Sequence, residues 1–219
     1  MSTYKIIIVG SSSVGKTSLC RNINGNIFDD KIPLTIGVDF ISIELTGKSY
    51  DSDKNDKQYK LRIWDTAGHE NYRSITKSFY KGSHIILLCF DLTNRSSFAE
   101  LDQWMDEINS IINSVVYICL IGLKSDLEPV VDDEEITAFL NKHLITTFRR
   151  YSSKKEQNSE KIEHILLNLV RKYDMVLDDY KFINEINNSE FRLDKKLMPN
   201  EYNNKTVTID SEFFKRECC

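Results

Sequence analysis

Apolar runs separated by amphipathic stretches fill the chain up to about residue 173. Consecutive apolar residues are typical of strands buried on both faces of a sheet, and apolar residues three or four positions apart are typical of helices. The predicted buried strands are residues 4–9, 84–90 and 115–121, with residues 146–151 as a last strand. The predicted helices are residues 15–24 and 98–112, one helix after the acidic residues 132–135, and one with an apolar stripe over residues 162–170.

One pair of segments has apolar residues at every second position. Ile41, Ile43 and Leu45 alternate with polar residues, which predicts a half-buried strand. Residues 59–64 are its predicted antiparallel partner. Residues 47–57 are polar and rich in Asp, Lys, Asn and Ser, so we expect an exposed hairpin loop between the two strands.

Strands that alternate with helices predict an α/β fold. We expect an open, mostly parallel six-stranded sheet with helices on both faces. Ligands of such sheets bind at the carboxyl ends of the strands. Beyond residue 174 the periodicity weakens. We therefore expect one domain over residues 1–173 and a flexible tail over residues 174–219.

The composition agrees with one domain and an appendage. The chain has 219 residues, of which 41% are hydrophobic and 28% are charged. A net charge of −4 gives no basic footprint, so no nucleic-acid partner is expected. No apolar run approaches the roughly 20 residues that span a bilayer, and the N-terminus lacks the pattern of a signal peptide. We expect a cytosolic chain unless something anchors it. None of the five cysteines has zinc-site spacing, and Cys89 and Cys119 are expected to be buried.

Residues 10–17 read G-S-S-S-V-G-K-T and fit the pattern G-x-x-x-x-G-K-[ST]. A predicted strand precedes this loop and a predicted helix follows it, which is the context of a phosphate-binding loop. Its backbone N–H groups would face the phosphates, and the helix N-terminus adds partial positive charge. Lys16 would reach the β- and γ-phosphates and Thr17 would ligate Mg²⁺. The alternative is a Ser/Gly loop that only caps a helix.

Three further residues suit the metal and the γ-phosphate. Asp65 follows a predicted strand and could hold Mg²⁺ through water. Gly68 lacks a side chain, so its N–H could approach a γ-phosphate closely. The Thr35 hydroxyl, within residues 33–37, could complete the metal shell only when the γ-phosphate is present. Such conditional ordering would make a switch.

The chain resembles the Rab-type small GTPases of the Ras superfamily. The stretches that carry the resemblance within residues 4–173 are residues 36–40, 60–64, 72–76, 79–82 and 90–93. It implies a P-loop NTPase G domain that binds GTP or GDP with Mg²⁺ and acts in vesicle trafficking. The hairpin loop at residues 47–57 is longer than in most members.

The resemblance also implies how the base is read. Lys124 and Asp126 match the end of the N-K-x-D motif, and the Asp126 carboxylate would accept two hydrogen bonds that adenine cannot donate, which disfavours an ATP-using enzyme. The stem of Lys124 would lie along the purine, with Phe28 stacked on the other side. Ser152, Ser153 and Lys154 stand for the S-A-K loop. The full set of predicted nucleotide-binding residues is Gly10, Ser12, Ser13, Val14, Gly15, Lys16, Thr17, Ser18, Phe28, Thr35, Asp65, Gly68, Lys124, Asp126, Ser152, Ser153 and Lys154.

Two positions depart from the family pattern. Leu123 replaces the Asn that bonds the base edge and ties this loop to the phosphate loop. Lost bonds of this kind cost about 1–3 kcal/mol each, so we expect weaker affinity and faster exchange. His69 replaces the Gln that orients the attacking water. A ring with an ordinary pKa of about 6.5 can be protonated and then cannot accept. We expect slow hydrolysis with Lys16 and His69 as the catalytic residues.

The family pattern leaves two alternatives at His69. It could still position the water or act as a base. It could instead mark a degenerate GTP-bound scaffold that recruits effectors without meaningful hydrolysis. GAPs of this family supply an Arg and a Gln in trans, so catalysed turnover could survive in either case.

The resemblance implies an effector surface built on an apolar triad of Phe40, Trp64 and Phe79, with Ile36 and Tyr72 beside it. The alternative places Phe40 and Trp64 in the strand core. Expected partners are effectors, a GAP, an exchange factor and a GDI-type prenylation escort, and we expect a monomer.

Cys218 and Cys219 end the chain and match the double geranylgeranylation pattern. From residue 174 onward, ten acidic residues face seven basic ones, so the tail lacks a polybasic second signal. One lipid chain binds only marginally, so anchoring is expected to need both cysteines. We expect a peripheral protein on the cytoplasmic face of vesicle or organelle membranes, with a cytosolic pool.

Overall fold

The structure is a computed structural model that describes residues 1–47, 56–68, 73–155 and 159–190. The elements in chain order are β1 (Ser2–Val9), α1 (Lys16–Ile23), β2 (Val38–Gly47), β3 (Lys57–Thr66), α2 (Arg73–Tyr80), β4 (Ile85–Asp91), α3 (Arg95–Ala99), α4 (Leu101–Ile111), β5 (Tyr117–Leu123), α5 (Asp133–Lys142), β6 (Thr147–Tyr151) and α6 (Ser159–Glu190). Among these, no helix is both long and apolar enough to cross a bilayer.

One six-stranded sheet organises the fold, with the strand order β2-β3-β1-β4-β5-β6. β2 and β3 are antiparallel, and every other neighbouring pair is parallel. This confirms the predicted α/β class and the mostly parallel sheet. All strands except β2 run parallel to β1, so their carboxyl ends lie at the same edge of the sheet. The loops that follow these strands can converge there.

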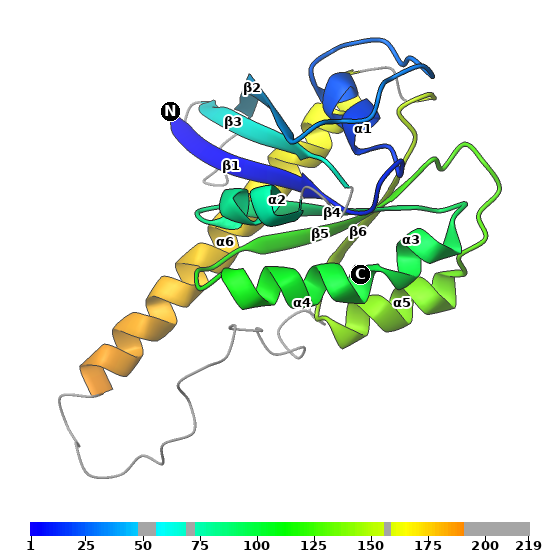
Figure 1. The fold of residues 1–219 in the computed structure, drawn as a ribbon. Coiled ribbons are helices and arrows are strands. Elements are labelled where there is room, and N and C mark those ends of the chain that lie inside the picture. Colours follow the sequence, from blue (N-terminus) through cyan, green and yellow to red (C-terminus); the bar gives the residue numbers. More distant parts are fainter. Residues whose placement is uncertain (48–55, 69–72, 156–158, 191–219) are drawn as a thin grey trace.

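Helices cover both faces of the sheet (Figure 1). Alternate residues of β1 point to opposite faces, so Ile6 and Ile8 enter one core while Ile7 and Val9 enter the other. The first core also contains Leu19 of α1 and buried residues of α6. The second contains residues of α2, α4 and α5, including fully buried side chains such as Tyr80.

Two features of the helices differ from the pattern in the sequence. The helix expected over residues 98–112 is divided into α3 and α4, and it begins earlier because the side chain of Asn94 accepts hydrogen bonds from the N–H groups of Ser96 (3.0 Å) and Ser97 (3.4 Å). The predicted apolar face of this segment is buried. Helix α2 was not predicted. Its last residue, Tyr80, is fully buried and donates to Glu107 of α4 at 3.0 Å.

Helix α6 crosses the predicted start of the tail. It continues past Asp174 to Glu190, and its far end projects away from the sheet (Figure 1). Tyr4 of β1 donates its hydroxyl to the Asp174 carboxylate at 2.8 Å, and Lys57 of β3 lies 3.5 Å from the same group. The expected boundary between domain and tail therefore falls inside one helix. Most of the predicted hairpin loop lies outside the described residues.

Candidate functional site

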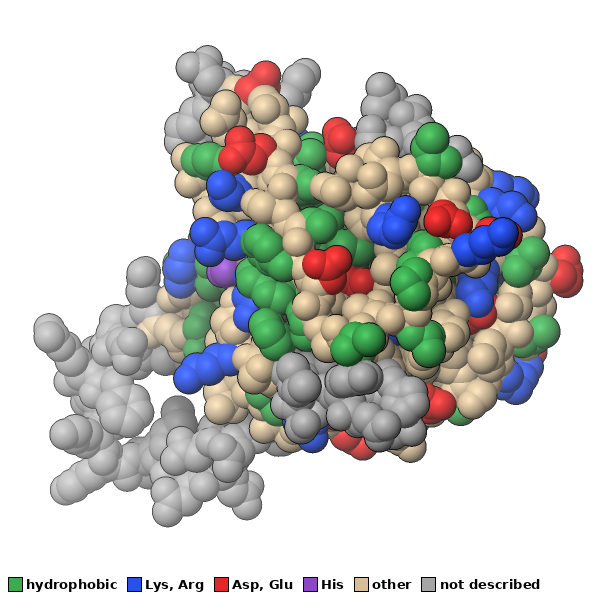
Figure 2. Space-filling view, turned by 45° about the horizontal axis from the view of Figure 1, so that its top comes forward, with side chains coloured by type: hydrophobic (Ala, Val, Ile, Leu, Met, Phe, Trp, Pro, Cys, Tyr) green, Lys and Arg blue, Asp and Glu red, His purple; other side chains and the backbone are tan. Residues whose placement is uncertain are grey.

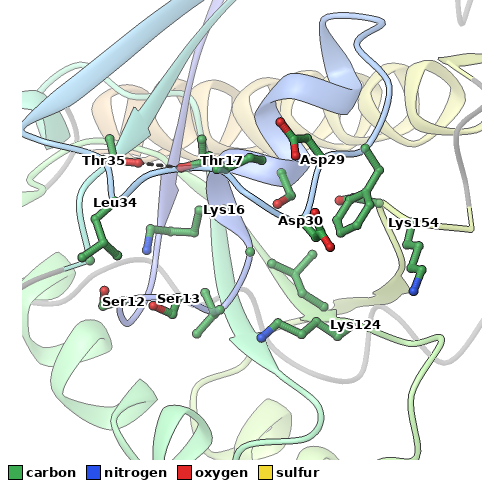
Figure 3. A pocket seen from close by; sticks show the side chains of 18 of the residues that line it. Ser12, Ser13, Lys16, Thr17, Asp29, Asp30, Leu34, Thr35, Lys124 and Lys154 are labelled. Atoms are coloured by element: carbon green, nitrogen blue, oxygen red, sulfur yellow. Dashed lines mark hydrogen bonds between the residues drawn. The ribbon is translucent and has the colours of Figure 1, made fainter.

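A cavity of 720 Å³ opens at the carboxyl ends of the parallel strands. It gathers five segments that are far apart in the sequence: the loop after β1 with the start of α1, the segment between α1 and β2, the end of β3, the loop after β5 and the loop after β6 (Figure 3). The predicted residues that line it are Ser12, Ser13, Val14, Gly15, Lys16, Thr17, Ser18, Phe28, Thr35, Gly68, Lys124, Asp126, Ser153 and Lys154.

Three predicted nucleotide-binding residues lie just behind the cavity wall. Gly10, Asp65 and Ser152 do not line the cavity, but each is bonded to a residue that does. A side chain at Gly10 would place its Cβ 2.1 Å from the Cys89 carbonyl oxygen, so only glycine fits between the loop and β4. The loop then turns sharply through Ser13 and Gly15, which have positive φ angles of 63° and 110°.

Lys16 lies beneath this loop and is 5% exposed. Its ammonium group donates to the carbonyls of Gly10 at 2.8 Å and Ser11 at 2.7 Å. Burial lowers the pKa of Lys16 to about 8. A phosphate beside this ammonium would favour its charged form, so the position suits an anionic ligand.

The three predicted metal ligands converge on one point. The hydroxyl oxygens of Thr17 and Thr35 lie 2.6 Å apart (Figure 3). Thr17 also donates to Asp65 Oδ2 at 2.7 Å. Asp65 is 1% exposed, and its Oδ1 atom has no hydrogen-bond partner among the described residues. Burial raises the pKa of Asp65 to about 6. A buried oxygen without a partner beside two hydroxyls fits a hard cation such as Mg²⁺.

Gly68 closes the cavity over the phosphate loop. A Cβ at this position would lie 2.4 Å from the Lys16 ammonium and 2.5 Å from the Ser11 carbonyl oxygen. The backbone at Gly68 can therefore approach this part of the cavity only without a side chain, as the sequence predicts.

At the other end of the cavity, two loops form one unit. Ser152 is 1% exposed and donates to Asp126 Oδ1 at 2.6 Å, while its oxygen accepts from the Lys155 N–H at 3.1 Å. The N–H of Ser125 also donates to the Tyr151 carbonyl at 3.3 Å. These bonds hold the Asp126 carboxylate against the loop after β6.

Leu123 contacts the phosphate loop through apolar atoms. It is 2% exposed, and its Cδ1 atom lies 3.7 Å from the position that a Cβ of Gly15 would take. The loop after β5 and the phosphate loop therefore pack together at this point, and the Leu123 side chain forms no hydrogen bond between them.

Two groups that the motifs do not mention support the site. Glu100 accepts from Ser11 Oγ at 2.5 Å, and the Trp104 indole N–H donates to the same oxygen at 3.4 Å. Asp91 at the end of β4 lies 2.6 Å from the Lys124 ammonium. In the sequence, Asp91 stands directly after a predicted buried strand and within residues 90–93, one of the stretches that carry the family resemblance.

Comparisons with known proteins decide the family. The model of the Ras family matches residues 5–174. Ras-related protein Rab-19 of Mus musculus is 34% identical over 163 residues, 73% of this chain and 71% of that protein, and human Rab-19 is 35% identical over 161 residues with the same two shares. GTP-binding protein ypt4 of Schizosaccharomyces pombe is 35% identical over 158 residues, 71% of this chain and 66% of that protein.

The chain belongs to the Rab family of small GTPases, within the Ras superfamily. It is therefore a GTP-binding switch of membrane trafficking that hydrolyses GTP and binds GTP and GDP. Effectors, GAPs, exchange factors and GDI are the general partners of this family. Its relatives suggest association with vesicle or organelle membranes.

Two predicted effector residues of this Rab-family GTPase, Ile36 and Phe40, follow Thr35 closely in the chain. Phe40 is 48% exposed and Ile36 is 81% exposed, so neither belongs to the core. The rings of Phe40 and Trp64 are 4.8 Å apart, and the Lys5 ammonium lies 4.9 Å from the Trp64 ring. Trp64 and Phe79 are partly buried against the second core. Figure 2 shows hydrophobic side chains gathered in patches on one face of the molecule.

Four predicted residues cannot be placed. His69, Tyr72, Cys218 and Cys219 lie outside the described residues.

Proposed function

We propose that this GTPase binds Mg²⁺ together with GTP or GDP in the cavity, and that Thr35 reports which nucleotide is present. The convergence of Thr17, Thr35 and Asp65 is the observation that carries the proposal. Thr17 lies on a rigid helix and Asp65 on a central strand, whereas Thr35 lies in a segment without regular structure. Only Thr35 can therefore leave the metal without disturbing the sheet.

The remaining site residues have roles that follow from their chemistry. Lys16 and the loop N–H groups neutralise the phosphates, and the Gly68 N–H faces the γ-phosphate. Asp126 reads the guanine edge, while Lys124 and Phe28 hold the two faces of the base. Thr17 and Asp65 would hold Mg²⁺ in both nucleotide states, and the bound metal would offset the charge of the phosphates.

His69 makes intrinsic hydrolysis slow in this proposal. Its two ring nitrogens point in different directions, so it cannot offer water an acceptor and a donor at the span of a Gln amide. We place the rate below the intrinsic rate of related GTPases, which is on the order of 10⁻⁴–10⁻³ s⁻¹. A GAP that supplies its own Gln and Arg restores turnover.

Membrane attachment is proposed to depend on Cys218 and Cys219. Each would carry a geranylgeranyl chain, since a single lipid holds a protein only marginally at a membrane. The protein would then act as a monomer on the cytoplasmic face of its membrane and return to a cytosolic pool with an escort of the GDI type.

The metal proposal is tested by measuring the release rates of fluorescent GDP and of a non-hydrolysable GTP analogue. Each rate is measured with and without a chelator. Chelation is expected to speed both releases at least about tenfold, since the ligand set is built around a cation. Thr35→Ala is expected to speed release of the GTP analogue and leave GDP release unchanged. Two results would overturn the proposal: release that ignores the chelator, or equal effects of Thr35→Ala on both nucleotides.

A further inference from the structure

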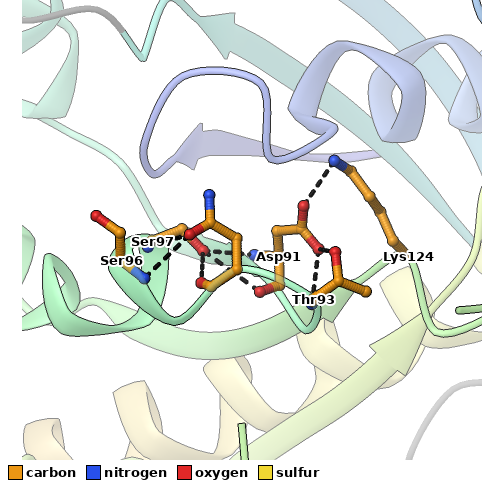
Figure 4. A network of polar contacts seen from close by, with 6 residues as sticks. Asp91, Thr93, Ser96, Ser97 and Lys124 are labelled. Carbon is orange, nitrogen blue, oxygen red and sulfur yellow. Dashed lines mark hydrogen bonds and ion pairs between the residues drawn. The ribbon is translucent and has the colours of Figure 1, made fainter. Parts of the chain in front are cut away.

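Asp91 is a buried carboxylate at the end of β4 whose two oxygens have different partners (Figure 4). The residue is 4% exposed. Oδ1 accepts from the N–H of Thr93 at 2.8 Å and from its hydroxyl at 2.7 Å. Oδ2 lies 2.6 Å from the ammonium group of Lys124. Oδ1 thus fixes the carboxylate to its own turn, and Oδ2 faces Lys124, which follows the neighbouring strand β5.

The sheet places this carboxylate directly beside the base-reading loop. Asp91 and Leu123 are register partners in the parallel pair β4 and β5, and the N–H of Leu92 donates to the Leu123 carbonyl at 3.1 Å. Lys124 is therefore the first residue beyond the paired strands. It has a positive φ of 60°, a conformation that non-glycine residues rarely adopt.

The residue before Lys124, Leu123, brings no polar side chain to this loop. The side chain of residue 123 is a leucine that meets the phosphate loop only through apolar atoms. On the opposite side, Ser152 holds Asp126. Lys124 lines the cavity with its side chain 39% exposed, so its stem faces the ligand space while its ammonium reaches the buried carboxylate. A charge-assisted contact of this length is among the stronger polar contacts.

We propose that Asp91 is a positioning residue for the nucleotide: its carboxylate anchors the Lys124 ammonium and so fixes the lysine stem against the base. The proposal rests on the proposed binding of a guanine nucleotide in this cavity. Because the stem contacts the face of a base and not its edge, the anchor raises the affinity for purine nucleotides without choosing among guanine-like bases. The choice belongs to Asp126.

A double-mutant cycle on GDP release tests the anchor. Asp91→Asn keeps an oxygen for Thr93 and turns an amide NH₂ toward Lys124, so the turn is retained and the ion pair is lost. We expect GDP release about five- to tenfold faster, in line with loss of one charge-assisted contact. Lys124→Met is expected to speed release as well, and Asp91→Asn to add nothing further in that background.

Two controls separate positioning from folding. Thr93→Val removes a hydrogen bond from the same carboxylate but leaves the ion pair, and GDP release should stay within about twofold of wild type. The ratio of GDP to IDP affinity should be unchanged in Asp91→Asn, since IDP lacks only the 2-amino group at the base edge.

Additive effects of Asp91→Asn and Lys124→Met would overturn the proposal, and so would a changed GDP-to-IDP ratio. Should Asp91→Asn not fold, Asp91→Glu carries the same cycle, because its longer carboxylate keeps the charge but displaces the ammonium. A wild-type protein that fails to bind GDP at all would contradict the proposed function instead, so the two failures are distinguishable.

Discussion

At the scale of single residues, the site depends on buried polar atoms whose partners are supplied by a ligand or by a distant loop. Asp65 shows the first case, because its Oδ1 atom is buried and no described group donates to it. Asp91 shows the second case, because it holds a lysine from a neighbouring loop. Each residue gains its role from what surrounds it.

Leu123 gives the sharpest prediction at this scale. Leu123→Asn is expected to slow GDP release about tenfold, because an amide can bond the base edge and the phosphate loop where leucine offers only apolar contact. The measurement is the release of fluorescent GDP from the loaded protein. Leu123→Met is the matched control, since it keeps the apolar contact and should leave the rate unchanged. An unchanged rate in Leu123→Asn would contradict the predicted weakness of this loop.

The sequence predicts those site residues that belong to local motifs. Lys16 and Thr17 follow from the loop and helix that carry them, and the structure places both at the cavity. The roles of Glu100 and Asp91 were missed because each contacts a loop that is distant in the sequence and that only the folded sheet brings close. Ser11 and Glu100 are 89 positions apart, and no local pattern encodes such a contact.

At the level of helices and strands, the buried strands were predictable because a short run of consecutive apolar residues fits few structures other than a strand buried on both faces. The far half of α6 was not, since its residues beyond Asp174 contribute little to the core and so show weak periodicity. Helix α2 was missed for a similar reason: it is short, and its packing depends on the neighbouring α4. Tertiary contacts with α4 therefore decide α2.

The junction of β1 and β4 carries a pH prediction. The Lys5 N–H donates to Nδ1 of His84 at 2.7 Å, so this nitrogen must be unprotonated. Burial lowers the pKa of His84, and the Lys5 ammonium lowers it further. The unfolded chain, with an ordinary pKa of about 6.5, therefore takes up a proton first as the pH falls. The stability from neutral His84 is present above that pH and is lost as the pH falls through the lowered folded value.

The predicted loss of stability is checked by urea unfolding of wild type and His84→Gln between pH 5 and pH 8. The difference in free energy of unfolding should be constant above about pH 7 and shrink below about pH 6.5, by at most about 1.4 kcal/mol per pH unit. A difference that stays constant over the whole range, or grows on acidification, would show that His84 does not titrate as its surroundings require.

At the scale of the whole molecule, the sheet separates two cores and brings five distant segments to one edge. Thr35 and the exposed Phe40 lie on the same connection from α1 into β2, only a few residues apart. A change in the bonds of Thr35 therefore has a short path to the surface that effectors are expected to read. This link between cavity and surface is what a nucleotide switch requires.

The decisive measurement for this switch is single-turnover GTP hydrolysis with Mg²⁺, with wild type beside His69→Gln. We predict slow hydrolysis by wild type, below roughly 10⁻⁴–10⁻³ s⁻¹, a clear gain in His69→Gln, and loss of both activities on chelation. Equal rates in the two proteins would contradict the role given to His69. Hydrolysis that is indifferent to chelation would contradict the metal site on which the switch is built.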